Sequence, residues 1–114
     1  MRCIARSRLA LIPYHLDPSP RLITESLALD VPVLVNSQIL GGWKYVQPET
    51  GSFFEDGFDV AAEAVHCLSS SYQAKSWVRR QYGRDRAARR FAGYLRGLGG
   101  AAHLDYALPT ALFL

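Results

Sequence analysis

Short apolar runs separated by a helical repeat dominate the first third of the chain. Residues 8–13 form an apolar run that stops at a proline, which is typical of a short buried strand. Residues 31–36 form a second run that is too short for a helix and predicts a strand covered on both faces, as in a parallel sheet. Between them, residues 20–29 carry apolar positions at helical spacing. This pattern predicts a strand–helix–strand unit of an α/β fold.

The ends of this first helix have their own signals. Ser19 followed by Pro20 predicts an N-cap and a first helical residue that needs no N–H. The apolar positions predicted to be buried are Leu22, Ile23, Leu27 and Leu29.

After residue 36 the pattern changes to a long loop, one more short strand and three helices. The loop covers residues 37–50, and the strand is expected at 52–54. Asp59 predicts the cap of a helix that the serine run after Leu68 ends. Its apolar positions are Val60, Ala61, Ala64, Val65 and Leu68.

Two further helices are predicted toward the C-terminal end. One covers about residues 72–82 and stops at Gly83, which favours a left-handed cap. Asp85 predicts the cap of the last helix. Its apolar stripe is Ala88, Phe91, Ala92, Leu95 and Leu98. Residues 1–98 are therefore assigned to one domain, and 99–114 to an apolar tail of unknown role.

Composition is that of an ordinary globular domain. The chain has 114 residues, of which 49% are hydrophobic and 20% charged. No apolar run approaches the about 20 residues that cross a bilayer, and the basic start lacks the features of a secretory signal, so we expect a cytoplasmic location. The two cysteines and three histidines have no metal-ligand spacing, which predicts no metal and no cofactor.

The net charge of +3 hides a basic segment. Eight basic residues and one acidic residue lie between Lys75 and Arg96. Such a segment attracts phosphate groups, but it is equally typical of a solvated helix face. Nucleic-acid binding is not favoured, because no recognised nucleic-acid motif is present. Contact with an anionic membrane surface is the other alternative.

Two carboxylates flank the start of the first predicted helix. Asp17 precedes it and Glu25 lies eight residues further on, inside it. The unpaired N–H groups and the positive dipole end of a helix N-terminus attract a diphosphate. A carboxylate beyond the phosphates can accept hydrogen bonds from ribose hydroxyls. Taken alone, however, Arg21 and Glu25 are also spaced as a surface ion pair, and Asp17 can simply make a turn.

With the segments that follow, these residues resemble the C-terminal domain of GT-B-type glycosyltransferases. The resemblance covers Asp17 to Asn36, then Ile39 to Trp43, and Glu49 to Gly51. In that family a Glu, seven residues and a second Glu precede a Pro-Val strand, a Gly-Gly loop and a Thr-Gly turn. Asp17 stands in place of the first Glu, and prolines at 18 and 20 replace glycines, which removes two N–H donors.

The resemblance implies a nucleotide-sugar donor as substrate and transfer of a hexosyl group with retention. Asp17 would contact the donor sugar, Glu25 the ribose, and the glycine loop would let the backbone approach the donor. The full set of expected donor-binding residues is Ser19, Arg21, Glu25, Asn36, Gly41, Gly42, Trp43 and Lys44. Asn36 is included because ligands bind beyond the carboxyl ends of parallel strands. Trp43 can stack on a base or sugar, but an aromatic residue beside a glycine loop is equally often part of the core. Lys44 can pair with phosphate, although a solvated loop lysine is the more common case.

The resemblance also implies an incomplete enzyme. The fold expected is an incomplete Rossmann-like parallel sheet, a GT-B C-terminal half-domain, followed by C-terminal helices. The N-terminal acceptor domain and the upstream basic residues that hold the diphosphate are missing, so we expect the isolated chain to be inactive. The alternatives are a non-catalytic nucleotide-binding module, or a basic helical surface that binds RNA or anionic lipid.

Overall fold

The computed structural model describes residues 2–55 and 57–98. Three parallel strands form one sheet in the order β1-β2-β3. They are β1 (Ala10–Ile12), β2 (Val33–Asn36) and β3 (Gly51–Phe54). Ala10 is in register with Val33, and Val33 with Gly51. The predicted α/β fold with a parallel sheet is therefore confirmed, and each predicted strand lies within its predicted run or one residue from it.

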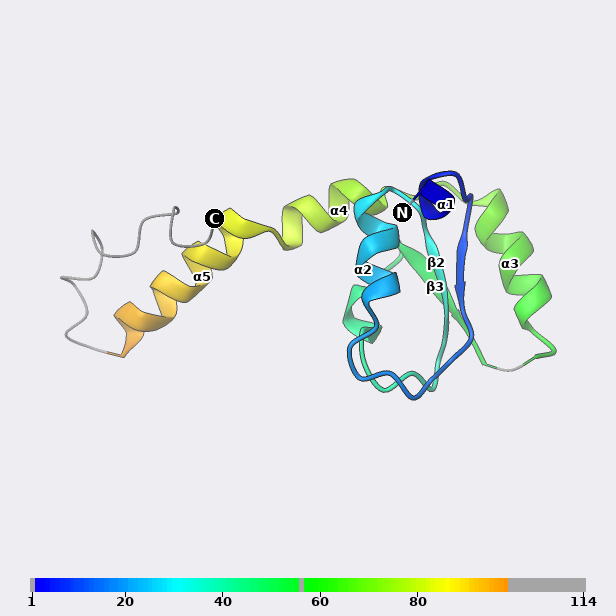
Figure 1. Cartoon of the computed structure of the whole chain (residues 1–114), viewed down its shortest axis with the longest axis horizontal. Helices are drawn as coiled ribbons and strands as arrows, with labels where there is room; N and C mark the ends of the chain where they lie inside the picture. Colours follow the sequence, from blue (N-terminus) through cyan, green and yellow to red (C-terminus); the bar gives the residue numbers. More distant parts are fainter. Residues whose placement is uncertain (1, 56, 99–114) are drawn as a thin grey trace. The chain divides into compact units, whose positions relative to one another are not determined.

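Two helices cover the sheet, α2 (Arg21–Ala28) on one face and α3 (Val60–Ser69) on the other (Figure 1). The hydrophobic core is divided into two clusters, one on each face of the sheet, because successive side chains of β2 point to opposite faces. Val33 and Val35 belong to the core under α2, whereas Leu34 packs with Phe54 and Cys67 under α3. All three β2 side chains are fully buried, as a strand covered on both faces requires. The α2 core consists of Ile12, Ile23, Leu27, Val33, Val35, Ile39, Val46 and Ala74.

The remaining elements are short α1 (Arg2–Ala5), the 3₁₀ turn η1 (Trp43–Tyr45), α4 (Ala74–Gln81) and α5 (Arg84–Gly97). The chain forms two compact units, residues 1–78 and 79–114, and the boundary falls within α4. The tail predicted for 99–114 lies outside the described residues. No helix in the described part of the chain is long and apolar enough to cross a membrane.

The buried face of α3 differs from the prediction. Val65 and Leu68 are exposed, at 64% and 41%, and Cys67 is buried instead. Cys67 lies three residues after Ala64 and seven after Val60, so these three side chains share one helical face toward the sheet. A reduced cysteine behaves as a small hydrophobic residue, which the apolar pattern of larger side chains concealed.

Helix caps also differ. α2 begins one residue later than predicted, with Pro20 and not Ser19 at the N-cap position. α5 begins after Gly83, whose φ of 117° is open to glycine, and Asp85 lies inside the first turn instead of capping it. Asp59 does occupy the N-cap position of α3, but its carboxylate accepts the N–H of Glu55. The N-cap residues of α2, α3 and α5 therefore make no side-chain capping hydrogen bond.

Candidate functional site

A small pocket lies at the start of α2, and we call it the α2 pocket. Its volume is about 210 Å³. The lining residues are Pro18, Ser19, Pro20, Arg21, Thr24, Gly42, Lys44 and Tyr45. Four predicted donor-binding residues, from two separate segments, line this one cavity. The structure thus brings together the helix start and the glycine loop.

One wall of the α2 pocket is the turn that leads into the helix. The Oδ1 atom of Asp17 accepts the N–H of Ser19 at 2.8 Å, which closes a local turn. Pro20 then occupies the N-cap position, and its carbonyl accepts the N–H of Ile23 at 3.3 Å. Asp17 therefore shapes this wall, although its side chain does not line the pocket.

The glycine loop packs directly on that turn. A β-carbon at Gly41 would overlap the carbonyl group of Pro18. Gly42 has a φ of 77°, and a β-carbon there would come within 2.6 Å of the Pro20 ring. Gly41 thus lets the two segments meet backbone to backbone, whereas Gly42 leaves room for the Pro20 ring and the Ile23 side chain. Of the two glycines, Gly42 lines the α2 pocket.

The η1 turn provides the other wall. Lys44 and Tyr45 both line the pocket, and the Lys44 Nζ atom lies 5.1 Å from the centre of the Tyr45 ring. Thr50, fully buried, holds this turn in place. Its hydroxyl donates to the carbonyl of Tyr45 at 2.7 Å and accepts the N–H of Gln47 at 2.7 Å. The Thr-Gly turn therefore acts as an anchor for the residues that line the pocket.

The two carboxylates of the predicted frame are satisfied locally. Glu25 lies 3.5 Å from Arg21, one helical turn away, and neither Glu25 nor Asp17 lines the pocket. The Arg21 side chain is 87% exposed, so this ion pair is a weak contact at the surface. Asp17 thus makes a turn and Glu25 a surface ion pair, which are the two local alternatives to a role in ligand binding.

Asn36 lies at the carboxyl end of β2 and links neighbouring segments. Its side-chain Nδ2 donates to the carbonyl of Pro13 at 3.2 Å, and its Oδ1 accepts the N–H of Gln38 at 2.9 Å. The amide thereby ties the ends of β1 and β2 together.

A second pocket lies beyond the carboxyl ends of β2 and β3, and we call it the carboxylate pocket. Its volume is about 500 Å³. It is lined by Ser37, Ile39, Trp43, Phe53, Glu55, Asp59 and Glu63. Trp43 enters this pocket and not the α2 pocket, so consecutive residues of η1 line two different cavities. The position is the one where open α/β sheets bind ligands.

Two of the three acids in the carboxylate pocket accept hydrogen bonds from neighbouring residues. Asp59 accepts the N–H of Glu55 at 3.0 and 3.2 Å, and Glu63 lies 3.3 Å from the Ser52 hydroxyl. Sequence reasoning missed this group, since Asp59 was interpreted only as a cap. The available signal was the four-residue spacing of Asp59 and Glu63 in a helix that starts just after a buried strand.

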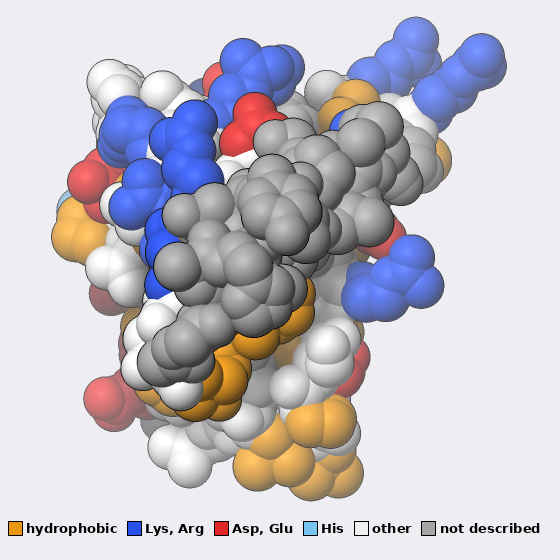
Figure 2. Space-filling model, turned by 90° about the vertical axis from the view of Figure 1, so that its left-hand side faces the viewer, with side chains coloured by type: hydrophobic (Ala, Val, Ile, Leu, Met, Phe, Trp, Pro, Cys, Tyr) orange, Lys and Arg blue, Asp and Glu red, His pale blue; other side chains and the backbone are white. Residues whose placement is uncertain are grey.

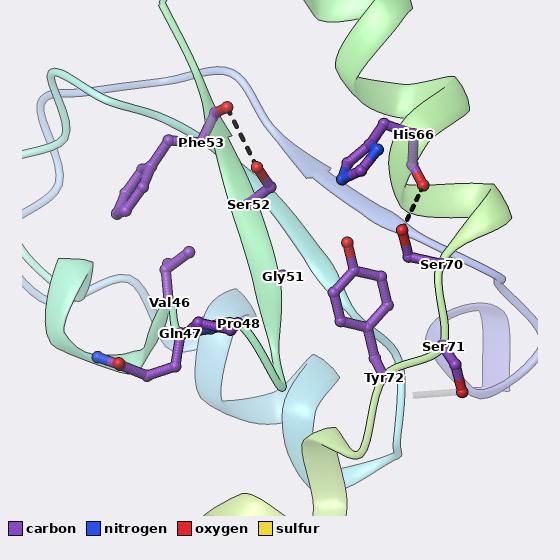
Figure 3. A pocket seen from close by; sticks show the side chains of 10 residues that line it. All are labelled: Val46, Gln47, Pro48, Gly51, Ser52, Phe53, His66, Ser70, Ser71 and Tyr72. Carbon is purple, nitrogen blue, oxygen red and sulfur yellow. Dashed lines mark hydrogen bonds between the residues drawn. The ribbon is translucent and has the colours of Figure 1, made fainter.

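A third cavity of about 460 Å³ lies along β3 (Figure 3), and we call it the Tyr72 pocket. Its lining residues are Val46, Gln47, Pro48, Gly51, Ser52, Phe53, His66, Ser70, Ser71 and Tyr72. The Ser70 hydroxyl donates to the His66 carbonyl at 2.7 Å and not to the imidazole ring. This hydrogen bond does not place Ser70 as a nucleophile on the His66 imidazole.

Two tyrosines, Tyr72 and Tyr14, have side-chain pKa values raised by their surroundings. Burial raises the pKa of the Tyr72 phenol above its usual value, and the hydrogen bond and charge of Cys67 raise this pKa further. A hydrogen bond with Ser70 acts in the opposite direction. Burial also raises the pKa of Tyr14, to which the negative charge of Asp17 adds. Both phenols stay protonated near neutral pH, so they can donate hydrogen bonds but are poor bases.

Comparison with known proteins gave no relative. A scan against protein-family models, a search of curated proteins and a search of solved structures each found no match. Across residues 2–55 and 57–98, no group of three or more His, Cys, Asp or Glu side chains could hold a metal ion. Any assignment of function therefore depends on the pockets themselves.

Proposed function

We propose that the chain is the donor-binding part of a GT-B-type glycosyltransferase, and that the α2 pocket holds the diphosphate of a nucleotide-sugar. In the full-length parent, the hexosyl group of this donor would pass to an acceptor bound elsewhere. The observation that carries the proposal is the joint lining of one cavity by Ser19, Arg21, Gly42 and Lys44. All four belong to the set of eight donor-binding residues expected from the sequence.

The chemistry of the α2 pocket favours an anion. Arg21 and Lys44 bring two positive charges to it, and the N-terminal end of α2 adds its partial positive charge. Because Pro18 and Pro20 have no N–H, the two cationic side chains must supply much of the binding energy. Stabilising a leaving diphosphate in this way is electrostatic catalysis that requires no metal.

The carboxylate pocket extends the proposal to the rest of the donor. Trp43 offers an aromatic face on which a sugar or base can stack. The carboxylates of Glu55, Asp59 and Glu63 can accept hydrogen bonds from sugar hydroxyls. Since η1 contributes to both pockets, one ligand with an anionic centre and a hydroxylated end fits the pair better than a simple phosphate does.

The two acids named by the resemblance take indirect positions in this scheme. Asp17 shapes the turn that carries Ser19, and in the donor complex it would face the sugar. Glu25 makes a weak surface ion pair with Arg21 in the absence of a ligand and would accept hydrogen bonds from the ribose hydroxyls once the donor is bound. The three parallel strands with helices on both faces support, at the level of the fold, a part of a larger Rossmann-like sheet.

Calorimetric titration with uridine, adenosine and guanosine diphosphates, and with the corresponding glucose conjugates, tests the proposal. Lys44→Ala should weaken binding by about 10–100-fold, as expected for the loss of one charge-assisted hydrogen bond. Lys75→Ala is the matched control, because it removes the other lysine of the chain, which lines none of the three pockets described above. Absence of binding for every nucleotide, or equal losses in the two variants, would contradict the proposal.

A non-catalytic nucleotide-binding module remains the alternative, favoured by the local engagement of Asp17 and Glu25. Hydrolysis of the donor distinguishes the enzyme from the non-catalytic module. Release of free sugar by the isolated chain, lost in Lys44→Ala, supports an enzyme. Tight binding without release supports the module.

A further inference from the structure

Helix α5 carries an apolar stripe that the fold does not bury. Tyr94 and Leu98 are 65% and 64% exposed, and Phe91 is 45% exposed. These residues are spaced three and four apart and therefore share one face of the helix. Ala88 and Ala92, four residues apart on the adjoining face, are buried. The helix thus buries one half of its apolar arc and exposes the other half, which contains the larger side chains.

Arginines adjoin this exposed stripe. Arg90 lies four residues before Tyr94, at one edge of the stripe, and Arg84 lies seven before Phe91, at its N-terminal end. The Arg90 guanidinium is 5.9 Å from the centre of the Tyr82 ring. Arg86, Arg89 and Arg96 occupy the opposite face and are exposed. Lys and Arg side chains are visible in blue on the face drawn in Figure 2.

We propose that α5 lies on the surface of an anionic lipid bilayer, with Tyr94 and Leu98 inserted at the level of the headgroups. Helices that bind in this way combine aromatic and leucine side chains on one face with a basic opposite face. Tyrosine is suited to the interface, since its ring is apolar and its hydroxyl polar. Charge complementarity selects a lipid with an anionic headgroup.

An RNA would use the same charges differently. Binding to an RNA backbone would depend on all the exposed arginines of α5 alike and would not require Leu98, which can neither stack on a base nor pair with phosphate. A bilayer requires Leu98 and gives greatest weight to the arginines beside the stripe. This inference is independent of the proposed nucleotide-sugar site, which lies among residues 18–45.

Vesicle flotation with the full chain tests the proposal, because aggregated protein does not float. Vesicles of phosphatidylserine and phosphatidylcholine in equal amounts should carry the chain upward, and vesicles of phosphatidylcholine alone should not. Tyr94→Ala and Leu98→Ala should each lower the partition coefficient about tenfold at unchanged charge. Arg84→Gln with Arg90→Gln should lower it about 20-fold or more, and by more than the far-face pair Arg86→Gln with Arg89→Gln.

Several results would overturn the proposal. They are no flotation with anionic vesicles, equal flotation with neutral vesicles, or no effect of Tyr94→Ala and Leu98→Ala while circular dichroism shows both variants folded. Displacement from the vesicles by a single-stranded RNA, with equal losses for the two arginine pairs, would assign α5 to nucleic acid instead.

Discussion

Gly41 lies directly against the carbonyl group of Pro18, so that a β-carbon at position 41 would overlap the carbonyl oxygen. The contact joins the glycine loop to the turn before α2. A backbone hydrogen bond next to it reinforces the contact, since the N–H of Leu40 donates to the carbonyl of His15 at 3.0 Å. The shape of the α2 pocket therefore depends on a close backbone contact between the glycine loop and the turn before α2.

Gly41→Ala should destabilise the chain by about 1–3 kcal/mol, because a backbone carbonyl cannot move aside as a flexible side chain can. Thermal unfolding measures the loss, at roughly 4–8 °C for each kcal/mol. Gly93→Ala is the control, since nothing lies within 4 Å of a β-carbon at that helical position. It should be neutral or slightly stabilising. Equal melting temperatures for the two variants would show that the loops are not in close contact.

Thr50→Val should cost about 1–3 kcal/mol at nearly constant volume. The buried hydroxyl bonds the Tyr45 carbonyl and the Gln47 N–H, and both groups would lose a partner. Chemical denaturation measures the change. Thr24→Val is the comparison, since the Thr24 hydroxyl only donates to the Arg21 carbonyl within α2, and it should change stability by less than about 0.5 kcal/mol. A smaller loss for Thr50→Val than for Thr24→Val would contradict the anchoring role.

Stability should fall at alkaline pH. The folded-state pKa of Tyr72 is raised above the unfolded value, so its contribution is fully present below about pH 10 and is lost as pH rises through the folded pKa. Tyr72→Phe should make the free energy of unfolding less dependent on pH above about 10. Denaturant titrations of both proteins across that range provide the measurement. An unchanged slope in Tyr72→Phe would show that Tyr72 does not carry the effect, although Tyr14 contributes in the same direction.

Self-association is expected for the isolated chain. Both β1 and β3 are edge strands of the described sheet, and Leu11 and Phe53 on them are exposed. Sedimentation velocity should show larger species as concentration rises. Phe53→Lys should reduce them, because a charged side chain on an edge opposes pairing. A cooperative, concentration-independent melt of a monomer would contradict this expectation.

Local patterns predicted the elements better than the site. The run at 31–36 predicted β2 and its burial on both faces, because a parallel strand depends mainly on its own apolar side chains. The prediction of which face of α3 is buried was wrong, because Cys67, a small residue, fills the space against Leu34 and Phe54. Which helical face is buried depends on contacts with distant strands, and these are not encoded in the spacing alone.

For the candidate site, too, the local features were predictable from the sequence and the long-range contacts were not. Sequence proximity accounts for the Arg21–Glu25 pair and for the Asp17 turn, both of which are local. The carboxylate pocket was not foreseen, because it forms only when the ends of β2 and β3 bring Trp43 near Glu63. That the helix start and the glycine loop would line one cavity followed from the resemblance and not from periodicity.

The most direct test of the account is to map where a nucleotide-sugar binds, by following backbone amide resonances of the isotope-labelled chain during titration with the glucose conjugate that binds in calorimetry. The account predicts that the shifts concentrate at Ser19, Arg21, Gly42 and Lys44, with a second group at Trp43 and Glu55. Shifts confined to α5, or spread without preference over the chain, would contradict a donor site at the start of α2.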